Sequence, residues 1–395
     1  MILTNKQEEA LKIAVGRYRS KEPYTCIAGF AGSGKTTLIK FIIAALNLSP
    51  DDVGYAAFTG KAATVLTQKG CANATTAHKL LYHATPTKDG KFVFKPRTEL
   101  ENPYKLIVID EISMLPKTMW NLLLTHRVHV LALGDPAQLP PVDKDEDNHV
   151  LDEPHIFLDE IMRQAQESEI IRLSMHVREG KPFSSFHCEG KQVKIFQASK
   201  LDTSICDWAD QILCATNAVR TGMNNFVRER KGLGTLPEAG DKIISLKNHW
   251  DTYSEMDGWA LTNGTIGTIN DYTVSTKRLP KFIAGGKDLQ YMKTNFTIDT
   301  GDRFTSVPID YQCLLTGNPS LNAKEAYMMN KNQALPDAPY EFAYAYAITV
   351  WKAQGSEWNK VLLLEEKFPF DAETHCKYLY TGITRAADKL VVATK

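Results

Sequence analysis

A single stretch, GFAGSGKT at residues 29–36, constrains the fold of this chain more than any other. It fits the pattern G-x-x-x-x-G-K-[ST], in which backbone N–H groups surround nucleotide phosphates. Residues 24–28 before it are predicted as a buried strand, and residues 37–46 after it as a helix with an apolar stripe. The alternative is a glycine-rich turn that happens to precede a helix. The order of strand, loop, Lys35-Thr36 and helix favours the phosphate loop, because the helix N-terminus then adds N–H donors for anions.

The residues of this loop have separate expected roles. Lys35 is expected to reach the β- and γ-phosphates, and the Thr36 hydroxyl to bind Mg²⁺. The glycines permit backbone torsions that other residues resist. The expected nucleotide-binding residues of the loop and of the helix that follows are Gly29, Ala31, Gly32, Ser33, Gly34, Lys35, Thr36 and Thr37.

Two carboxylates supply the second chemical signal. Residues 106–109 form an apolar strand that ends in Asp110-Glu111. Behind a phosphate loop, Asp110 is the expected Mg²⁺ ligand and Glu111 is placed to polarise the attacking water. Gln138 lies in a proline-containing, rigid loop at 134–141 and is expected to contact the γ-phosphate or the water. The set favours hydrolysis of a nucleotide over its storage.

Composition limits the class of protein. At 395 residues the chain is expected to form two to four domains, and 43% hydrophobic with 23% charged residues is typical of a soluble globular protein. No apolar run suits a bilayer or a secretory signal, so we expect a cytoplasmic protein without a membrane partner. Seven scattered cysteines form no C-x-x-C pair and indicate reduced thiols. Because the formal net charge is zero, a nucleic-acid partner requires a local basic groove.

Polar residues follow further predicted strands. A strand at 53–58 ends at Thr59 and Lys61, and another helix begins near Thr75 and His78. Taken singly, these residues are ordinary helix caps. Because ligands of open α/β sheets gather at the carboxyl ends of the strands, the set is also suited to a sugar-phosphate backbone.

Two segments interrupt the α/β pattern. Residues 82–103 contain the hairpin signal Asp89-Gly90, followed by Phe92 and Phe94. This hairpin is either a small structural excursion, which the sequence alone favours, or a wedge that stacks on a base pair at a strand-separation fork. From about residue 240, short alternating strands predict a small β module, and helix-friendly α/β sequence resumes at residue 341.

These motifs together resemble the superfamily-one helicases of the RecD-like 5′→3′ subgroup, and are most similar to the small phage Dda helicases. The resemblance runs from Thr4 to Ala386 in the family's motif order. It includes the adenine-reading Q motif at Leu3, Thr4 and Gln7, motif I at 29–36, motif Ia at 58–63, motif Ib at 75–78, motif II at 110–111, motif III at 134–141, motif IV at 163–164, motif V at 346–357 and motif VI at 380–386.

The resemblance implies further site residues. Gln7 is implied to read adenine, and Arg163 and Arg385 to contact the γ-phosphate. The resemblance implies that Gln354, Gly355 and Glu357 lie near nucleotide and DNA, in a strand that ends in Gln-Gly-Ser-Glu. It implies that Arg385 lies in a helix, within the sequence Thr-Arg-Ala. The chain departs from the family at Trp351 and Ala353, where His and Ser are usual. Trp351 then either replaces a DNA contact by base stacking or packs within the protein.

The implied architecture is α/β, with two RecA-like P-loop lobes. We expect lobe one at 1–157 with the 82–103 hairpin inserted, and lobe two at 158–244 plus 339–395. An SH3-like β module at 245–338 is implied as an insertion in lobe two.

The implied function is that of an ATP-dependent, Mg²⁺-dependent DNA helicase, acting as a monomer on single-stranded and forked duplex DNA. DNA contacts are expected from Thr59, Lys61, Thr75, His78, Phe92, Phe94, Thr349 and Trp351. Three alternatives remain open: a single-strand translocase that displaces proteins, a nucleotide-gated nucleic-acid binder, and an RNA substrate. Replication or recombination in a phage, with protein partners from those processes, is the expected setting.

Overall fold

The computed structural model describes residues 3–71, 74–86, 92–140, 144–161, 167–200, 202–256, 258–332, 335–366 and 371–395. These residues divide into two compact units. Unit 1 comprises Met1–His83, Lys95–Ala215 and Thr349–Lys395, and unit 2 comprises Ala84–Phe94 and Thr216–Ile348. Within the described ranges, no helix has both the length and the apolar character needed to cross a bilayer.

Unit 1 contains a six-stranded parallel sheet with the order β3-β2-β6-β7-β1-β8. Its strands are β1 (Tyr24–Gly29), β2 (Val53–Ala57), β3 (Thr75–Thr76), β6 (Leu106–Ile109), β7 (His129–Gly134) and β8 (Ile156–Leu158). Strand β1 lies between β7 and β8, so the loop that follows it opens at the carboxyl edge of the sheet, where α/β proteins bind ligands.

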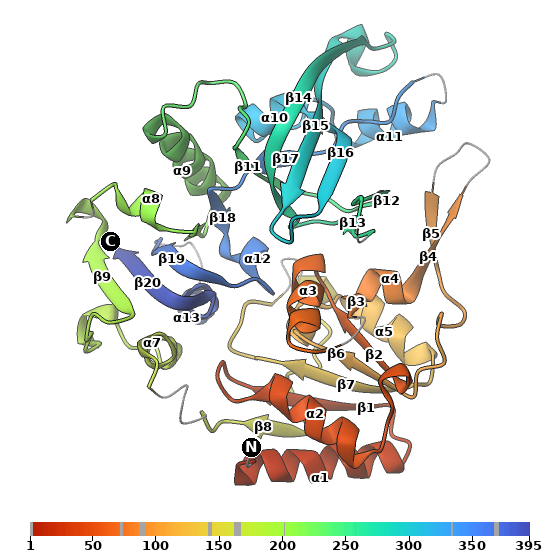
Figure 1. Ribbon diagram of the computed structural model, residues 1–395, viewed down its shortest axis with the longest axis vertical. Coiled ribbons are helices and arrows are strands. Elements are labelled where there is room, and N and C mark those ends of the chain that lie inside the picture. Colours follow the sequence, from red (N-terminus) through yellow and green to blue (C-terminus); the bar gives the residue numbers. More distant parts are fainter. Residues whose placement is uncertain are drawn as a thin grey trace. The chain divides into compact units, whose positions relative to one another are not determined.

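Helices cover both faces of this sheet (Figure 1). On one face, α1 (Asn5–Arg19) and α2 (Lys35–Ala45) pack on Ile27, Val108 and Leu131. On the other face, α4 (Ala77–Leu81) and α5 (Lys117–Thr125) pack on alternate residues of the same strands, such as Cys26 and Ile107. Both faces are apolar because parallel strands between two helical layers are buried on each side. Helix α3 (Gly60–Gln68) follows β2.

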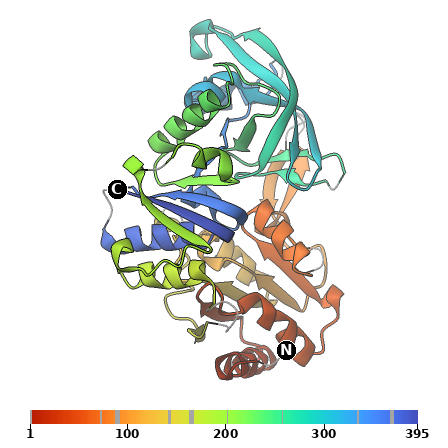
Figure 2. The same ribbon diagram turned by 60° about the vertical axis from the view of Figure 1, so that its left-hand side comes forward.

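A second parallel sheet in unit 1 has β10, β19, β20 and β9 as neighbours in that order. These strands are β9 (Val193–Gln197), β10 (Gln211–Cys214), β19 (Trp358–Leu364) and β20 (Ala386–Thr394). Helices α7 (Glu169–Arg178) and α13 (Ala372–Ile383) pack on each other beside it (Figure 2). The shorter elements are α8 (Ile205–Trp208), α12 (Val350–Ala353) and β18 (Ala347–Thr349). The two parallel sheets confirm the predicted α/β class.

The C-terminal motif residues lie on different elements from those predicted. The predicted strand through Gln354 is wrong, because β18 ends at Thr349 and the one-turn helix α12 intervenes. Arg385 does not lie within a helix either. Helix α13 ends at Ile383, and the Arg385 carbonyl accepts a hydrogen bond from the Trp358 N–H at 2.9 Å, so the chain has already entered the β19–β20 ladder.

Unit 2 is built on an antiparallel sheet with the order β16-β15-β14-β11-β17, in which every neighbouring pair of strands is antiparallel. Its strands are β11 (Lys242–Ser245), β14 (Ile266–Arg278), β15 (Asp288–Ile298), β16 (Arg303–Asp310) and β17 (Phe342–Tyr344). The sheet includes residues on both sides of the predicted β module at 245–338, because β11 begins at Lys242 and β17 ends at Tyr344. Residues 342–344 thus form a strand where helix-friendly sequence was expected. Strand β14 is also longer than the short strands predicted, since it pairs with β15 over almost its whole length.

The remaining elements of unit 2 surround this sheet. They are α9 (Asn217–Arg230), β12 (His249–Tyr253), β13 (Ala260–Leu261), α10 (Tyr311–Thr316) and α11 (Ala323–Lys331). A buried ion pair between Arg228 and Asp241, 2.9 Å long, ties α9 to the start of β11, and the Tyr346 hydroxyl donates to the same carboxylate. This carboxylate is therefore fully paired, as burial requires.

Strands β4 (Tyr82–Pro86) and β5 (Phe92–Pro96) form a separate two-stranded sheet. They flank the predicted Asp89-Gly90 turn, which lies outside the described residues. Arg97 closes the base of these strands, because its backbone N–H donates to the Leu81 carbonyl and its Nε to the Tyr82 carbonyl.

Candidate active site

The phosphate loop leaves β1 at Gly29 and enters α2 at Lys35. Gly34 caps the helix with a φ of 80°, a left-handed conformation that favours glycine. A Cβ at Gly29 would lie 2.7 Å from Ser33 Oγ and 2.9 Å from Leu158 Cβ, so this position has no room for a side chain. The Lys35 ammonium donates to the Gly29 and Phe30 carbonyls at 2.6 and 3.1 Å. The lysine is therefore held against the loop that it is expected to serve.

Orphaned polar groups at this loop fit a bound phosphate. Ser33 Oγ is buried and has no hydrogen-bond partner among the residues that the structure describes, and the same is true of Gln138 Oε1. No side chain caps the N-terminus of α2. Buried polar groups are almost always hydrogen-bonded, and a helix N-terminus attracts anions. The residues present therefore suit a nucleotide triphosphate.

Gln7 joins the N-terminal helix to the phosphate loop. Its amide nitrogen donates to the Ser33 carbonyl at 3.0 Å, and its amide oxygen accepts from the Thr4 N–H at 3.1 Å. The Thr4 hydroxyl accepts from the Gln7 N–H, which completes a capping box for α1. Gln7 thus lies against the loop, and its contact with adenine stays a prediction.

Asp110 and Glu111 follow β6 at the same edge of the sheet. Burial raises the pKa of Asp110 to about 6, the Glu111 charge adds to this, and Lys35 opposes it. Glu111 has a φ of 53°, which is unusual for a residue with a side chain and marks a constrained site. Gln138 Nε2 lies 3.5 Å from Glu111 Oε1. The structure therefore brings together the two residues expected to orient water.

Thr36 and Asp110 are the protein groups that would hold Mg²⁺. In the described part of the chain, no three acidic, histidine or cysteine side chains group around one metal position. Mg²⁺ usually takes one or two protein oxygen ligands and completes its shell with phosphate oxygens and water, so a hydroxyl and a carboxylate suit it. When bound, the ion would neutralise phosphate charge.

Tyr380, which was not among the expected site residues, connects the phosphate loop with the loop of Gln138. Its hydroxyl accepts from the Ala31 N–H at 2.8 Å and donates to Asp135 Oδ2 at 2.5 Å. Burial raises the pKa of the Asp135 carboxyl, while Lys35 and the Tyr380 hydroxyl oppose this. The only sequence signal for Tyr380 was its place at the start of motif VI.

Two further contacts fix the loop that follows Asp135. The Leu139 N–H donates to Thr381 Oγ1 at 2.9 Å, and Gln354 Nε2 donates to the Leu139 carbonyl at 2.7 Å. Thr381 and Gln354 are themselves buried. The C-terminal segment therefore binds both the N–H and the carbonyl of Leu139, the residue after Gln138. The sequence did not predict these contacts.

Of the two arginines implied to contact the γ-phosphate, the structure describes one. Arg163 lies outside the described residues. Arg385 is buried, and its three nitrogens donate to the Thr381 carbonyl, the Ser356 carbonyl and Thr384 Oγ1 at 3.1, 3.3 and 3.1 Å. A role for either arginine at the γ-phosphate stays a prediction.

The expected DNA contacts at α3 lie beside motif V. Thr59 caps α3 by accepting from the Ala62 N–H at 3.2 Å. Gly355 lies against this cap, because a Cβ built on it would be 2.8 Å from Ala62 Cβ and 3.1 Å from Thr59 Oγ1. Glu357, two residues further on, is exposed. The structure therefore places Thr59 and Gly355 together.

His78 and Trp351 are both engaged by other rings. His78 lies between Phe58 and Tyr82, with centroid distances of 5.8 and 5.9 Å, and burial lowers its pKa to about 4. Trp351 stacks on buried Tyr378 at 6.3 Å, so part of its ring packs within the protein. Neutral His78 provides no positive charge for a phosphate.

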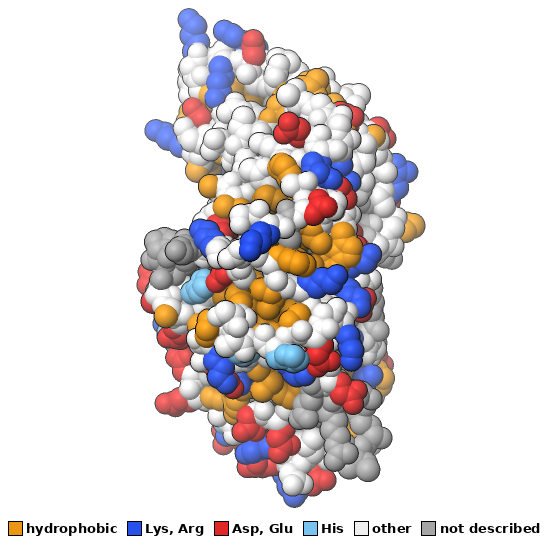
Figure 3. Space-filling view, turned by 90° about the vertical axis from the view of Figure 1, so that its left-hand side faces the viewer, with side chains coloured by type: hydrophobic (Ala, Val, Ile, Leu, Met, Phe, Trp, Pro, Cys, Tyr) orange, Lys and Arg blue, Asp and Glu red, His pale blue; other side chains and the backbone are white. Residues whose placement is uncertain are grey.

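For the remaining residues expected to contact DNA, the structure gives only their position or does not describe the side chain. Thr75 pairs with Ala56 in the β2–β3 ladder, and Thr349 is buried at the start of α12. The side chains of Lys61, Phe92 and Phe94 lie outside the described residues. On the face shown in Figure 3, basic and acidic side chains are interspersed, in line with the net charge of zero.

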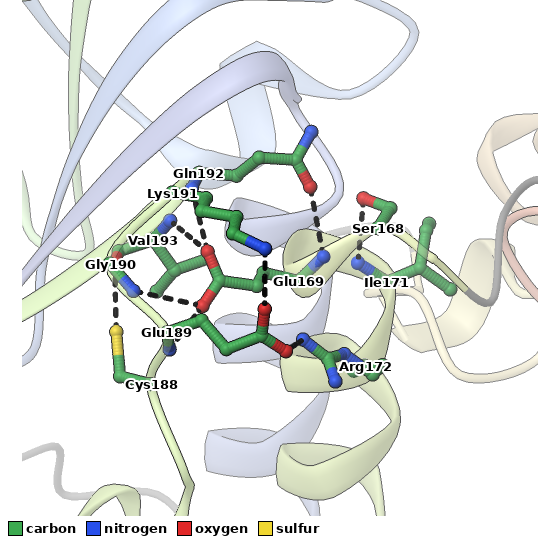
Figure 4. Close-up of polar contacts among 10 residues, drawn as sticks. All are labelled: Ser168, Glu169, Ile171, Arg172, Cys188, Glu189, Gly190, Lys191, Gln192 and Val193. Carbon is green, nitrogen blue, oxygen red and sulfur yellow. Dashed lines mark hydrogen bonds and ion pairs between the residues drawn. The ribbon is translucent and has the colours of Figure 1, made fainter.

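Glu169 organises the start of α7 and was not foreseen from sequence (Figure 4). Its carboxylate accepts four backbone N–H groups, those of Glu189, Gly190, Gln192 and Val193, at 2.5 to 3.2 Å. Burial alone would raise the pKa of this carboxyl, but the four donors outweigh it and hold the pKa below its usual value. The contact fixes α7 to the loop before β9.

Two family models match the chain. Residues 2–198 match the AAA domain, and residues 344–393 match the UvrD-like helicase C-terminal domain. The first match contains the phosphate loop, Asp110 and Gln138. The second contains Gln354, Tyr380 and Arg385.

Two characterised relatives are similar in sequence. The ATP-dependent RecD2 DNA helicase of Deinococcus radiodurans is 25% identical over 394 residues, which cover 93% of this chain and 46% of the relative. The ATP-dependent DNA helicase dda of Enterobacteria phage T4 is 32% identical over 151 residues, covering 36% of this chain and 34% of the relative. The chain therefore spans less than half the length of these relatives.

Solved structures share the fold. Pif1 of Bacteroides bound to single-stranded DNA has a TM-score of 0.55 at 18% identity, covering 99% of this chain and 92% of that one. The Pif1 helicase of Candida albicans has a TM-score of 0.51 at 19% identity, covering 100% and 94%. At this identity the likeness concerns the fold alone.

Proposed function

We propose that the chain is a superfamily-one, ATP-dependent DNA helicase that moves 5′→3′ on single-stranded DNA and unwinds duplex DNA. One observation carries the proposal. The Tyr380 hydroxyl accepts a hydrogen bond from the Ala31 N–H of the phosphate loop and donates one to Asp135. A nucleotide at Ala31 would therefore lie beside a residue of the C-terminal segment 344–393, which also carries Gln354 and Gly355.

Each site residue has its own role in the proposed reaction. Lys35 binds the phosphates, and Arg163 and Arg385 neutralise charge on the transferring phosphoryl group. Glu111 accepts a proton from the attacking water, which Gln138 holds in line. Gly355 and Glu357 complete the nucleotide and DNA contacts. Binding of the triphosphate closes the site and hydrolysis reopens it, so that alternating grips move the protein along the strand.

The proposed architecture is that of two RecA-like lobes, at 1–157 and at 158–244 plus 339–395. The β module at 245–338 is proposed to be SH3-like, and the 82–103 hairpin to be an insertion in lobe one. Thr59, Lys61, Thr75, His78 and Thr349 would hold the DNA backbone, and Trp351 would stack on a base. We propose that the protein acts as a monomer in the cytoplasm, at forked DNA in replication or recombination.

Phe92 and Phe94 are the proposed wedge residues, because they follow the hairpin turn and aromatic rings stack on bases. Changing each to alanine in turn should slow unwinding of forked DNA without slowing ATP hydrolysis on single-stranded DNA. If Phe92→Ala and Phe94→Ala both unwind forks as well as the parent, the wedge assignment is overturned.

Phosphate release with and without single-stranded DNA tests the proposed hydrolysis. The account predicts release that DNA stimulates and that Lys35→Ala abolishes. DNA binding that responds to ATP without turnover would instead identify a nucleotide-gated binding protein. Stimulation by single-stranded RNA but not by DNA of the same sequence would assign an RNA substrate.

A further inference from the structure

Arg178, the last residue of α7, lies over the ring of Phe30 in the phosphate loop. The guanidinium carbon is 3.4 Å from the ring centroid. The Phe30 ring is itself fixed, because it contacts the Phe157 ring edge-on at a centroid distance of 4.7 Å. A planar cation on an aromatic face is held in a defined orientation. The guanidinium is therefore positioned at the loop expected to bind phosphate.

One nitrogen of this guanidinium has no partner in the described part of the chain. Arg178 Nη1 is buried and donates to no atom of the described residues. A buried donor without an acceptor is unfavourable and calls for an explanation. Ser33 Oγ, in the same phosphate loop, is also buried and unpartnered. Phosphate oxygens would satisfy both groups, since arginine matches phosphate in charge and in geometry.

The described arginines at this site differ in what they already bind. Each of the three nitrogens of Arg385 donates to a protein oxygen. Arg178 differs in that its Nη1 has no partner among the described residues, while its guanidinium stacks on the Phe30 ring. A ligand that approached Phe30 would reach Arg178 without breaking a hydrogen bond of that nitrogen.

The position of Arg178 is set by the rest of α7. Glu169 at the other end of the helix binds four backbone N–H groups of the 189–193 segment (Figure 4). Helix α7 also packs on α13, whose Tyr380 contacts the next residue of the phosphate loop, Ala31. The helix therefore presents Arg178 from a fixed support, as a binding residue requires.

We propose that Arg178 is a further nucleotide-binding residue, whose Nη1 donates to a phosphate oxygen of the bound nucleoside triphosphate while the guanidinium stays stacked on Phe30. The inference rests on the proposed function, because it requires that the phosphate loop binds ATP. It adds a cation to the site that none of the sequence motifs predicted.

Calorimetric binding of AMP-PNP with Mg²⁺ tests this assignment without relying on turnover. Replacing Arg178 by Gln should weaken binding about tenfold, the order expected for losing a hydrogen bond to a charged group. Arg178→Lys should bind with intermediate affinity, since it keeps the charge but loses the planar fork. Phe30→Leu should weaken binding in the same direction, because it removes the surface on which the guanidinium rests.

Arg172→Gln is the matched control. Arg172 lies on the same helix and also has a buried, unpartnered nitrogen, but its charge is paired with Glu189 at 2.6 Å. This variant should bind AMP-PNP like the parent. The melting temperature of Arg178→Gln without nucleotide should not fall, because the substitution removes an unsatisfied donor.

The outcomes separate the two claims. A parent protein that binds AMP-PNP while Arg178→Gln binds it equally well overturns the inference and leaves the proposed function intact. A parent that does not bind AMP-PNP overturns the proposed function and the inference with it. If Arg178→Gln is unfolded, Phe30→Leu decides: binding as tight as that of the parent overturns the assignment.

Discussion

The Tyr380 hydroxyl accepts a hydrogen bond from the Ala31 N–H at 2.8 Å, although 349 residues separate the two in sequence. The same hydroxyl donates to Asp135, so one oxygen connects the phosphate loop, the C-terminal helix α13 and the loop that leads to Gln138. Sequence motifs predicted that these segments meet at a nucleotide. The structure identifies the atom through which they meet.

Removing this hydroxyl should uncouple the two loops. Tyr380→Phe removes the acceptor of the Ala31 N–H and the donor to Asp135 Oδ2, and should lower the free energy of unfolding by about 1–3 kcal/mol. We expect ATP turnover to fall about tenfold, because Gln138 would be misplaced. A loss of about 1.4 kcal/mol in transition-state stabilisation lowers a rate by that factor. Tyr378→Phe, on the same helix, loses a hydroxyl bond to the Leu364 carbonyl, away from Ala31 and Asp135, and should keep normal turnover. Equal turnover in the two variants would contradict this role for Tyr380.

Gly355 should not tolerate a side chain. Its φ is 71°, and a Cβ would lie 2.8 Å from Ala62 Cβ at the start of α3. We expect Gly355→Ala to lower the free energy of unfolding by at least about 1 kcal/mol from backbone strain alone, and to weaken binding of single-stranded DNA.

Gly16→Ala provides the matched comparison, because Gly16 lies inside α1 and nothing is within 4 Å of a Cβ built on it. This substitution should raise stability by up to about 1 kcal/mol. Chemical denaturation of both variants measures the contrast. A Gly355→Ala protein as stable as Gly16→Ala would show that α3 and Gly355 are not held as described.

The local elements of the candidate nucleotide site could be predicted from the sequence better than the contacts that support them. The phosphate loop, Asp110-Glu111 and the flanking strands were predictable because each depends on local patterns: glycines at a tight turn, apolar runs and a helix start. The roles of Tyr380, Glu169 and Arg178 were not. Each of them acts on residues distant in the chain or on bare backbone groups, and neither kind of contact leaves a pattern at the residue itself.

The same limit explains the errors in element boundaries. The segments at 347–357 and 380–386 carry the expected motif residues, but the end of a strand or helix is decided by tertiary pairing. Arg385 leaves α13 because its carbonyl joins the β19–β20 ladder through the Trp358 N–H. Residues 342–344 form β17 because β11 offers an open edge for antiparallel pairing.

His78 predicts a dependence of stability on pH. Burial lowers its pKa from 6.5 to about 4, so the folded protein binds fewer protons than the unfolded chain between these values. The contribution to stability is therefore fully present above about pH 6.5 and is lost as the pH falls toward 4. His78→Gln should lose less melting temperature between pH 7.5 and 5 than the parent. Parallel losses in the two proteins would contradict a buried, neutral His78.

Glu169→Gln should weaken the attachment of α7. The variant keeps the shape of the side chain but replaces a carboxylate that binds four N–H groups with an amide that has one acceptor oxygen, so several donors lose a charged partner. We expect a loss of about 2–3 kcal/mol in the free energy of unfolding. Because the pKa of Glu169 is lowered, the parent should lose this contribution as the pH falls through the folded-state value, whereas the variant should not.

Glu189→Gln is the control for Glu169→Gln, since Glu189 pairs with Arg172 and Lys191 at the surface, where ion pairs contribute little to stability. Denaturation at neutral pH compares the two. A larger loss from Glu189→Gln than from Glu169→Gln would contradict the anchoring role of Glu169.

Strand displacement on blunt, 5′-tailed and 3′-tailed DNA duplexes, with ATP and Mg²⁺, tests the central claim most directly. We expect unwinding of the 5′-tailed duplex, little unwinding of the other two, and none with Lys35→Ala. DNA-stimulated ATP hydrolysis without displacement of any strand would identify a translocase rather than a helicase. Efficient unwinding from the 3′ tail alone would contradict the proposed direction.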